Sequence, residues 1–530
     1  MKGKNKMFIL DLLGTNSLVE KSKTENWFEN ALQLDVHAGS TYPQVKGLTD
    51  DLFKAISQRI NINNKARSKE TLKTILLNLW VAYHDDKPVQ YSRSPNSYCH
   101  SRRYGKLHFK YNRVVTIIDT LEHMGLLKQV KGFYDKDKDI GRKTRMYASD
   151  DLIKMFNNDI PGSFEVVERL PRREIIEMRN EHKNLVDYKD NEHTVKMRRN
   201  LYQYNQFIKN QTISFIIPTD LPLKLKFLNN LKCYLLKGKM GINKLAINQD
   251  SVNDKINSIS INPLSKYYNP YNSNIDAHMY HNAEYSSITT MTNKVLELVK
   301  DNNGLYENKK FRLCDFGISS LDCEMKYELL HRVFNIESFD RGGRFYGAVH
   351  LELPKKIRKQ YIKINDNPTV ELDFAALHIR MLYHLMGIPY MDDPYTVLCD
   401  SDEERKIFKL AQLIAINAPD EELAIKAIRN AFRIKWIKYD LTNKSIGNLL
   451  TRFKEAHHPI AIFINKGKGR ELQNLDSKIT EIILVDLMNE NIPALPVHDS
   501  YIVEKAYQGV LADKMIEAYK KVMGFTPVIG

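Results

Sequence analysis

Hydrophobic and polar positions alternate in residues 369–374 (Thr-Val-Glu-Leu-Asp-Phe). A period of two is the pattern of a β-strand with one buried face. From Ala376 onward the apolar residues recur at helical spacing instead. The pattern therefore predicts that Asp373 lies where a strand gives way to a helix, a position from which its carboxylate can point into a cleft.

A second pair of short apolar runs lies in residues 493–504 (Pro-Ala-Leu-Pro-Val-His-Asp-Ser-Tyr-Ile-Val-Glu). The runs predict two strands joined by a tight turn that carries Asp499. Two aspartates on neighbouring strands, Asp373 and Asp499, are the minimum scaffold for a pair of Mg²⁺ ions, or Mn²⁺, serving in-line displacement at phosphorus. These two segments predict the palm of a nucleic-acid polymerase.

Residues 66–160 follow a different order, with helical spacing first and a hairpin pattern afterwards. The predicted segments are helices at 72–79 and 111–127 and strands at 126–134 and 144–148. This order is typical of a winged helix, whose recognition helix would start near Lys110, Tyr111 and Arg113. The wing would carry the cations Lys136, Lys138, Arg142 and Lys143.

Residues 161–335 are predicted to be mostly helical, which in a right-hand polymerase would make them thumb-like. Helical patterns mark the segments His193–Ile213, Glu284–Asp301 and Cys323–Val333. Residues 249–286 are rich in Asn, Ser and Tyr, which is typical of a long loop. The segment 1–65 carries no pattern that assigns it a role.

Charge indicates the kind of partner. The 530 residues carry a net charge of +15, and residues 87–145 hold 14 Lys and Arg against 5 Asp and Glu. A basic region of this kind favours a polyanion as the partner. With the polymerase palm predicted above, this polyanion is expected to be a DNA primer-template or a promoter or origin duplex. The alternatives are a solvated basic face and a winged helix that binds protein.

Composition narrows the class of protein further. No apolar run reaches transmembrane length, so no membrane partner is expected. The five cysteines are scattered without a CxxC pair, which argues against a zinc ribbon and favours a reducing, cytoplasmic compartment. The sequence identifies no protein partner.

Two further segments carry candidate binding residues. In the Gly-rich run 340–347, Arg341 and Arg344 are suited to phosphates and Tyr346 to stacking on a base or sugar, although a plain turn with exposed arginines shows the same pattern. On the predicted helix 404–418, Arg405, Lys409 and Leu413 recur every four residues. Two cations one turn apart can clamp a triphosphate, although such pairs also occur on solvated surfaces.

Tyr390-Met-Asp-Asp393 matches the metal-binding tetrapeptide of reverse transcriptases. The first of its aspartates lies only 19 residues after Asp373, which leaves room for one helix and no returning strand. The preceding Gly387-Ile-Pro389 is built of turn formers. We therefore predict a loop here rather than a metal site.

Five elements between 336 and 530 resemble, in order, motifs of the single-subunit polymerase superfamily, which comprises family A DNA polymerases and phage-type RNA polymerases. Asp340-Arg-Gly-Gly-Arg-Phe-Tyr346 is similar to the phage element Asp-x-x-Gly-Arg-x-Tyr, and Asp373-Phe-Ala-Ala-Leu-His-Ile-Arg380 to the family A motif Asp-Tyr-Ser-Gln-Ile-Glu-Leu-Arg. Residues 405–418 resemble the fingers motif Arg-Arg-x-x-Lys-x-x-Asn-Phe-Gly-x-x-Tyr-Gly. Gln473 resembles the family A glutamine that approaches the primer-template. Pro496-Val-His-Asp-Ser500 is similar to Val-His-Asp-Glu of the DNA enzymes and His-Asp-Ser of the RNA enzymes.

The resemblance implies roles for individual residues. Asp373 and Asp499 would bind the two metals, Arg405 would hold the nucleoside triphosphate, and Lys409 would also act as an acid toward pyrophosphate. The residues implied to lie near the primer-template are Arg344, Gln473 and His498. Only 90 residues separate Lys409 from Asp499, so the fingers are expected to be small.

The chain also departs from the family pattern at the nucleotide site. His378 stands where the DNA enzymes have the glutamate that excludes a ribose 2′-hydroxyl. Leu413 replaces the fingers aromatic, and Asn417-Ala418 replaces the later Tyr-Gly. Sugar preference therefore does not follow from the sequence.

Together these observations predict an α+β fold: a right-hand palm with small helical fingers at 336–530, preceded by a thumb-like region and a winged helix. The leading hypothesis is a template-directed nucleotidyltransferase, a DNA polymerase of family A type. The alternatives are a single-subunit RNA polymerase or primase, and a DNA-binding replication initiator whose palm does not catalyse.

Overall fold

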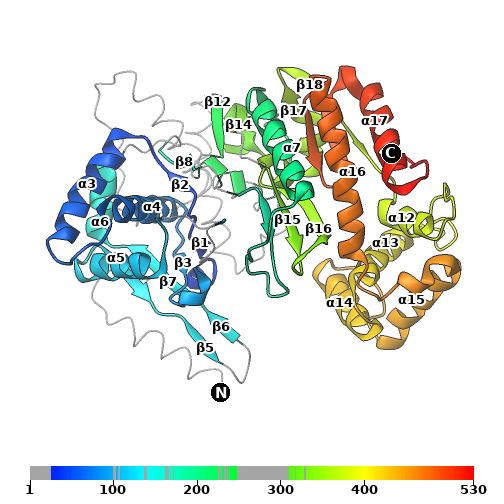
Figure 1. The fold of residues 1–530 in the computed structure, drawn as a ribbon, viewed down its shortest axis with the longest axis horizontal. Helices are drawn as coiled ribbons and strands as arrows, with labels where there is room; N and C mark the ends of the chain where they lie inside the picture. Colours follow the sequence, from blue (N-terminus) through cyan, green and yellow to red (C-terminus); the bar gives the residue numbers. More distant parts are fainter. Residues whose placement is uncertain are drawn as a thin grey trace. The chain divides into compact units, whose positions relative to one another are not determined.

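The computed structural model describes residues 25–98, 103–104, 108–135, 140–160, 166–170, 172, 174–224, 227, 230–231, 234–235, 237, 239–247, 310–316, 318–326 and 330–530. The chain divides into two compact units, one formed by Met1–Arg173 with Phe215–Glu328 and the other by Glu174–Ser214 with Leu329–Gly530 (Figure 1). Helices and several sheets make a mixed α/β structure. Within the described ranges, no helix has the length and apolar character needed to cross a membrane.

The first unit begins with helices packed on a small sheet. Its helices are α2 (Glu25–Glu29), α3 (Pro43–Ser57), α4 (Lys65–His84), α5 (Tyr111–His123) and α6 (Asp150–Asp159). The sheet has the order β1 (Leu32–Gln33), β3 (Val89–Tyr91), β7 (Thr144–Ala148) and β4 (Leu127–Val130). Two further pairs are β2 (Ala38–Gly39) with β8 (Glu168–Arg169), and β5 (Phe133–Asp135) with β6 (Ile140–Arg142). The predicted order of helices followed by a hairpin is thus present in α4, β3, α5, β4 and β7.

The remainder of the first unit is mostly strands where it is described. These strands are β11 (Leu223–Lys224), β12 (Met240–Ile247), β13 (Lys310–Phe311) and β14 (Ile318–Met325), and β10 (Ile213–Ile217) starts just before the unit boundary. A short 3₁₀ turn, η3 (Leu313–Phe316), precedes β14.

The prediction that 161–335 is mostly helical is wrong for the described residues. The segment Cys323–Val333 does not form a helix: it holds the end of β14 and the start of β15 (His331–Asn335). Leu321, Cys323 and Met325 are buried at alternating positions, which is the period of a strand. This period outweighs the helical spacing on which the prediction for Cys323–Val333 is based. The helix predicted at His193–Ile213 is present as α7 (Glu192–Lys209). The helix predicted at Glu284–Asp301 and the loop at 249–286 lie outside the described residues.

The second unit contains two sheets and most of the long helices. One sheet has the order β16 (Ser338–Tyr346), β15 and β9 (Ile176–Met178). Four further strands pair in the order β17 (Ile362–Ile364), β18 (Asn367–Asp373), β20 (Ser500–Glu504) and β19 (Ala494–Val497). Besides α7, the helices are α11 (Lys355–Tyr361), α12 (Leu377–Leu385), α13 (Asp402–Asn417), α14 (Glu421–Ile434), α15 (Asn443–Ala456), α16 (Gly469–Asn489) and α17 (Gln508–Met523). Short 3₁₀ turns are η4 (Val349–Glu352), η5 (His458–Phe463) and η6 (Lys505–Tyr507).

Helix α16 packs closely on strand β16, beside α7 and α17 (Figure 1). The approach depends on Gly343, whose φ is +91° and where a Cβ atom would stand 2.7 Å from Ser477 Oγ. Two buried ion pairs tie the same helix to the sheet. Arg332 donates to Glu481, and Arg344 donates to Asp476 at 2.8 Å. Gly343 of the Gly-rich run thus allows the helix to approach the strand.

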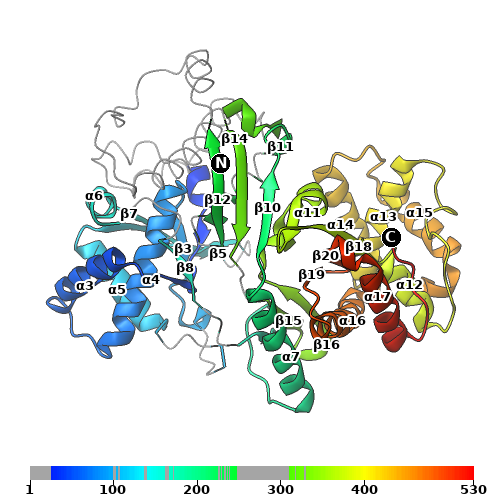
Figure 2. The same ribbon diagram turned by 90° about the horizontal axis from the view of Figure 1, so that it is seen from above.

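Helices α13, α14 and α15 pack against one another and form a small helical layer of the second unit (Figure 2). Their hydrophobic faces are buried around Phe408, Phe432 and Phe453. Ser401, Asp420 and Thr442 cap the three N-termini by accepting backbone N–H bonds. The helix predicted at 404–418 is confirmed as α13.

Candidate active site

The turn between β19 and β20 carries the second candidate aspartate next to the first. Asp373 lies opposite Ser500 in the antiparallel pairing of β18 with β20. The amide N–H of Phe374 donates to the carbonyl oxygen of Asp499 at 3.1 Å. Val497 pairs with Ser500, so only two residues form the turn, and His498 adopts a φ of +59° there. The two predicted strands and their neighbour relation are therefore confirmed.

The predicted change from strand to helix also occurs after Asp373. Strand β18 ends at Asp373 and α12 begins at Leu377, with Ala376 between them at a φ of +48°. This left-handed backbone is unusual for a residue other than glycine, asparagine or aspartate. The change of direction is held by Arg380, whose guanidinium donates to the carbonyl oxygens of Ala375 and of Asp392.

The charges around Asp499 show which side chains converge. Burial raises the pKa of the Asp499 carboxyl, and the negative charge of Asp373 raises it further. The cations Arg344 and Lys409 act in the opposite direction and lower it. Four predicted residues, drawn from β16, β18, the turn before β20 and helix α13, therefore lie within electrostatic reach of one another.

Sequence reasoning missed a third carboxylate, Asp476 on α16. It is 1% exposed, and burial raises its pKa to about 7 despite the ion pair with Arg344; the nearby Asp499 raises it too. Its Oδ1 atom has no hydrogen-bond partner among the described residues. A signal was available, because Asp476 is a charged residue in line with the apolar Leu472, Ile479 and Ile483 on the buried face of a helix.

Two histidines lie close to Arg344. Its Nη2 donates to Nε2 of His378 at 3.4 Å. Desolvation and the charge of Arg344 lower the pKa of His378 to about 4, and desolvation with the charges of Arg344 and Arg358 lowers that of His498 to about 4. Both imidazoles are therefore neutral at pH 7 and can accept hydrogen bonds. The half-exposed ring of Tyr346 lies 6.1 Å from that of His498.

The cations of α13 have different surroundings. Arg405 forms a bidentate ion pair with Asp393, one bond being 2.9 Å long, and its guanidinium stacks 4.9 Å from the centre of the Tyr395 ring. Asp393 belongs to the Tyr390-Met-Asp-Asp393 segment, which is a loop as predicted. Lys409 is exposed and forms no ion pair with a described residue.

The remaining predicted residues of the second unit lie on its surface or half-buried. Leu413, one turn after Lys409 on α13, is 47% exposed. The two residues therefore lie on an exposed face of this helix. Arg341 is exposed on β16, and Gln473 is half-buried on α16, three residues before Asp476.

The donors fit a small hard cation. The described residues contain no group of three or more His, Cys, Asp or Glu side chains arranged to hold a metal. Mg²⁺ is nevertheless usually held by one or two carboxylates, with water and substrate phosphates completing its shell. Asp373 and Asp499 supply that number. Their negative charges repel each other, and a cation bound between them would remove this repulsion.

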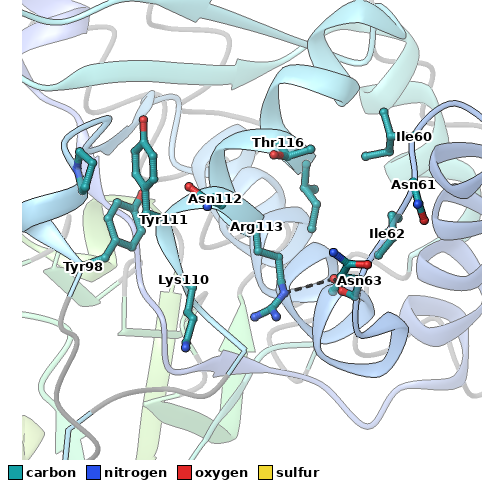
Figure 3. Close-up of a pocket in the computed structure, with 13 residues that line it drawn as sticks. Ile60, Asn61, Ile62, Asn63, Tyr98, Lys110, Tyr111, Asn112, Arg113 and Thr116 are labelled. Atoms are coloured by element: carbon teal, nitrogen blue, oxygen red, sulfur yellow. Dashed lines mark hydrogen bonds between the residues drawn. The ribbon is translucent and has the colours of Figure 1, made fainter.

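Below the first turn of α5, the first unit contains a pocket of about 500 Å³. Figure 3 shows Tyr98, Lys110, Tyr111 and Arg113 around it, together with the loop that precedes α4. Arg113 is held in place, since it donates to Ser68 Oγ at 3.2 Å and to the carbonyl oxygen of His108 at 2.7 Å. Burial and the charge of Arg67 lower the pKa of Arg113.

The predicted wing residues are only partly described. Lys136 and Lys138 lie outside the described residues. Lys143 is exposed, as a contact to a nucleic-acid phosphate requires. The expectation for Arg142 needs correction, because its side chain is only 10% exposed. It pairs with Glu29 at 3.5 Å and lies 5.5 Å from the centre of the Phe133 ring. Its guanidinium therefore makes contacts within the first unit and is not presented to a nucleic acid.

Comparisons with known proteins add little to this geometry. No protein-family model and no curated protein matches the chain. A solved structure that it resembles is the POL domain of Pol1 from M. smegmatis in complex with a DNA primer-template and dNTP. The match covers 63% of this chain and 68% of the other, at 11% sequence identity and a TM-score of 0.27. A TM-score this low carries no argument about fold or function.

Proposed function

We propose that this chain is a template-directed nucleotidyltransferase, a DNA polymerase of family A type. The observation that carries the proposal is the convergence of Asp373 and Asp499 on paired strands, with Lys409 and Arg344 in electrostatic reach. In this proposal the β17–β20 strands form the palm and α13–α15 form small fingers. The winged helix of the first unit delivers the palm to DNA.

The chemistry proposed for this site is phosphoryl transfer. Asp373 and Asp499 would hold two Mg²⁺ ions, which supply charge neutralisation at the reacting phosphate and activation of the attacking hydroxyl. Lys409 approaches the triphosphate from α13 and gives a proton to the departing pyrophosphate. Arg405 contacts the outer phosphates once Asp393 releases it. Neutral His378 would pack against the sugar of the nucleotide, and neutral His498 against the primer end.

RNA synthesis is the alternative within the same chemistry. The serine of the His-Asp-Ser sequence does not favour it, because the hydroxyl of Ser500 is buried and donates to Glu371 at 3.0 Å. A primase or RNA polymerase would use the same carboxylates. Incorporation of deoxynucleotides compared with ribonucleotides, with and without a primer, distinguishes DNA synthesis from RNA synthesis and primer extension from initiation without a primer.

A replication initiator with a non-catalytic palm is the second candidate function. The ion pair between Arg405 and Asp393 favours this function, because an arginine that is paired with a carboxylate is not available to bind a triphosphate. The parent protein would then bind DNA through the first unit and extend no primer with either nucleotide type. Such a result would remove the enzyme proposal.

Replacing Asp393 with Asn should release Arg405 and lower the KM for nucleotide by up to about fivefold, with kcat little changed. The size is limited because the pair is about 40% exposed, and ion pairs at such sites contribute about 1 kcal/mol or less. Steady-state incorporation kinetics measure it, with the exposed neighbour Asp392→Asn as the matched control. A rise in KM would show that Asp393 positions Arg405 rather than occupying it.

Neutralising Lys136, Lys138 and Lys143 together should weaken duplex binding and flatten its dependence on salt. Each lost phosphate contact should reduce the slope of log K against log salt by about 0.9. Arg142→Gln is the matched control and should leave the slope unchanged, because Arg142 is turned inward. An unchanged slope in the triple variant would indicate that this domain binds a protein instead.

A further inference from the structure

The turn after α14 exposes a large aromatic side chain that the proposed chemistry does not use. Trp436 is 86% exposed, and Ile434 beside it is 69% exposed. Large apolar side chains that lie together on a surface indicate a binding site for a partner, whereas single exposed ones are common. The other two tryptophans do not share this exposure: Trp80 is buried, and Trp27 is half-buried.

The backbone of the turn holds Trp436 outward. Its φ is +54°, a left-handed conformation that is costly for a bulky residue and persists only where the surroundings impose it. Backbone bonds on both sides impose it here: the N–H of Trp436 donates to Arg433 at 3.2 Å and that of Ile437 to Phe432 at 3.0 Å. Phe432 is fully buried and anchors the turn. The indole is therefore presented by a constrained turn.

Cations flank this aromatic side chain in the sequence. Residues 429–438 contain four Lys and Arg and no Asp or Glu. Arg429 is used locally, since it donates to the carbonyl oxygen of Leu441 and to Asn443. Arg433, Lys435 and Lys438 are exposed, and none of them forms an ion pair within the described part of the chain.

These features fit one class of partner better than another. The centre of a protein–protein interface is depleted in charged residues, and here three exposed cations lie within three residues of Trp436 in the sequence. Single-stranded nucleic acid takes both features, because bases stack on exposed aromatic rings while lysines and arginines follow the backbone. We propose that Trp436 stacks on an unpaired base of a single strand, with Arg433, Lys435 and Lys438 on the flanking phosphates. That this strand is the template rests on the proposed function.

Tryptophan fluorescence tests the contact without catalysis. The full chain is titrated with oligothymidylate in the absence of divalent metal and nucleotide. We expect quenching that the same length of blunt duplex does not produce. Trp436→Ala should weaken oligothymidylate binding, measured by anisotropy of a labelled strand, by about 5- to 100-fold, and Trp436→Phe should retain most of the affinity. The matched control is Tyr202→Ala, which removes an aromatic ring that is 57% exposed on α7.

The outcomes separate this inference from the proposed function. An Asp373→Asn chain that incorporates no nucleotide should show the same quenching, so loss of the enzyme proposal leaves the binding result intact. Unchanged affinity in a folded Trp436→Ala protein overturns the inference. So does concentration-dependent self-association that Trp436→Ala abolishes while oligothymidylate binding persists, since this turn would then bind protein.

Discussion

Replacing either Asp373 or Asp499 with Asn is expected to reduce metal-dependent nucleotide incorporation by at least about a thousand-fold, a barrier increase of about 4 kcal/mol. The amide keeps the size of the side chain but removes the charge that holds a divalent cation. Burial and the charge of Asp373 already destabilise the ionised form of the Asp499 carboxyl, as its raised pKa shows. The Asp499→Asn protein should therefore fold at least as well as the parent without metal.

Primer extension with radiolabelled deoxynucleotides measures the rate, and thermal unfolding in the presence of a chelator measures the fold. Asp366→Asn is the matched control, because Asp366 lies exposed in the turn that joins β17 to β18, the strand that ends at Asp373. Parent activity that survives both substitutions would exclude these carboxylates from catalysis. Loss of duplex binding together with activity would point to a structural effect instead.

Breaking the buried pair of Arg358 and Glu371 should destabilise the second unit by about 3–5 kcal/mol. Arg358 donates to both carboxylate oxygens of Glu371, at 2.8 and 3.0 Å, and the Glu371 side chain is 2% exposed. Glu371→Gln leaves the guanidinium buried without its counter-charge. Chemical denaturation at pH 7 measures the difference.

The same pair makes stability depend on pH. Burial raises the pKa of Glu371, but the hydrogen bonds and charge of Arg358, with Ser500, outweigh burial and leave the pKa below its ordinary value. A lowered pKa contributes stability above the pKa of the unfolded chain, about 4.3, and the contribution is lost as pH falls through the folded value. The gap in Tm between parent and Glu371→Gln should thus be widest near pH 7 and close in acid. A gap that widens in acid would contradict the pairing.

Local patterns predicted the elements around the candidate site well. The strand ending at Asp373, the hairpin around Asp499 and helix α13 each extend over few residues, and their hydrophobic period reports directly on burial. The order of short motifs then indicated that Asp373 and Asp499 would be neighbours. That step needed the chemistry of a metal site with two carboxylates, together with the resemblance, because spacing alone does not pair strands more than a hundred residues apart.

Contacts between distant segments could not be predicted in the same way. The sequence shows Asp393 and Arg405 as a loop residue and a helix residue, and nothing in either pattern pairs them. The apolar residues in line with Asp476 on α16 indicate that it is buried, but nothing in the sequence indicates that its partner is Arg344. The strands β14 and β15 were missed because short apolar runs fit a helix or a strand equally well.

The missing side chain at Gly343 also has a mechanical consequence. It lets α16 lie against β16, and ion pairs fasten that helix on both sides of the contact, at Asp476 and at Glu481. A helix latched in this way cannot slip by one residue without breaking two buried pairs at once. The Asp476 carboxylate is therefore stiffly coupled to the sheet, and any hinge that lets α13–α15 swing must lie outside α16.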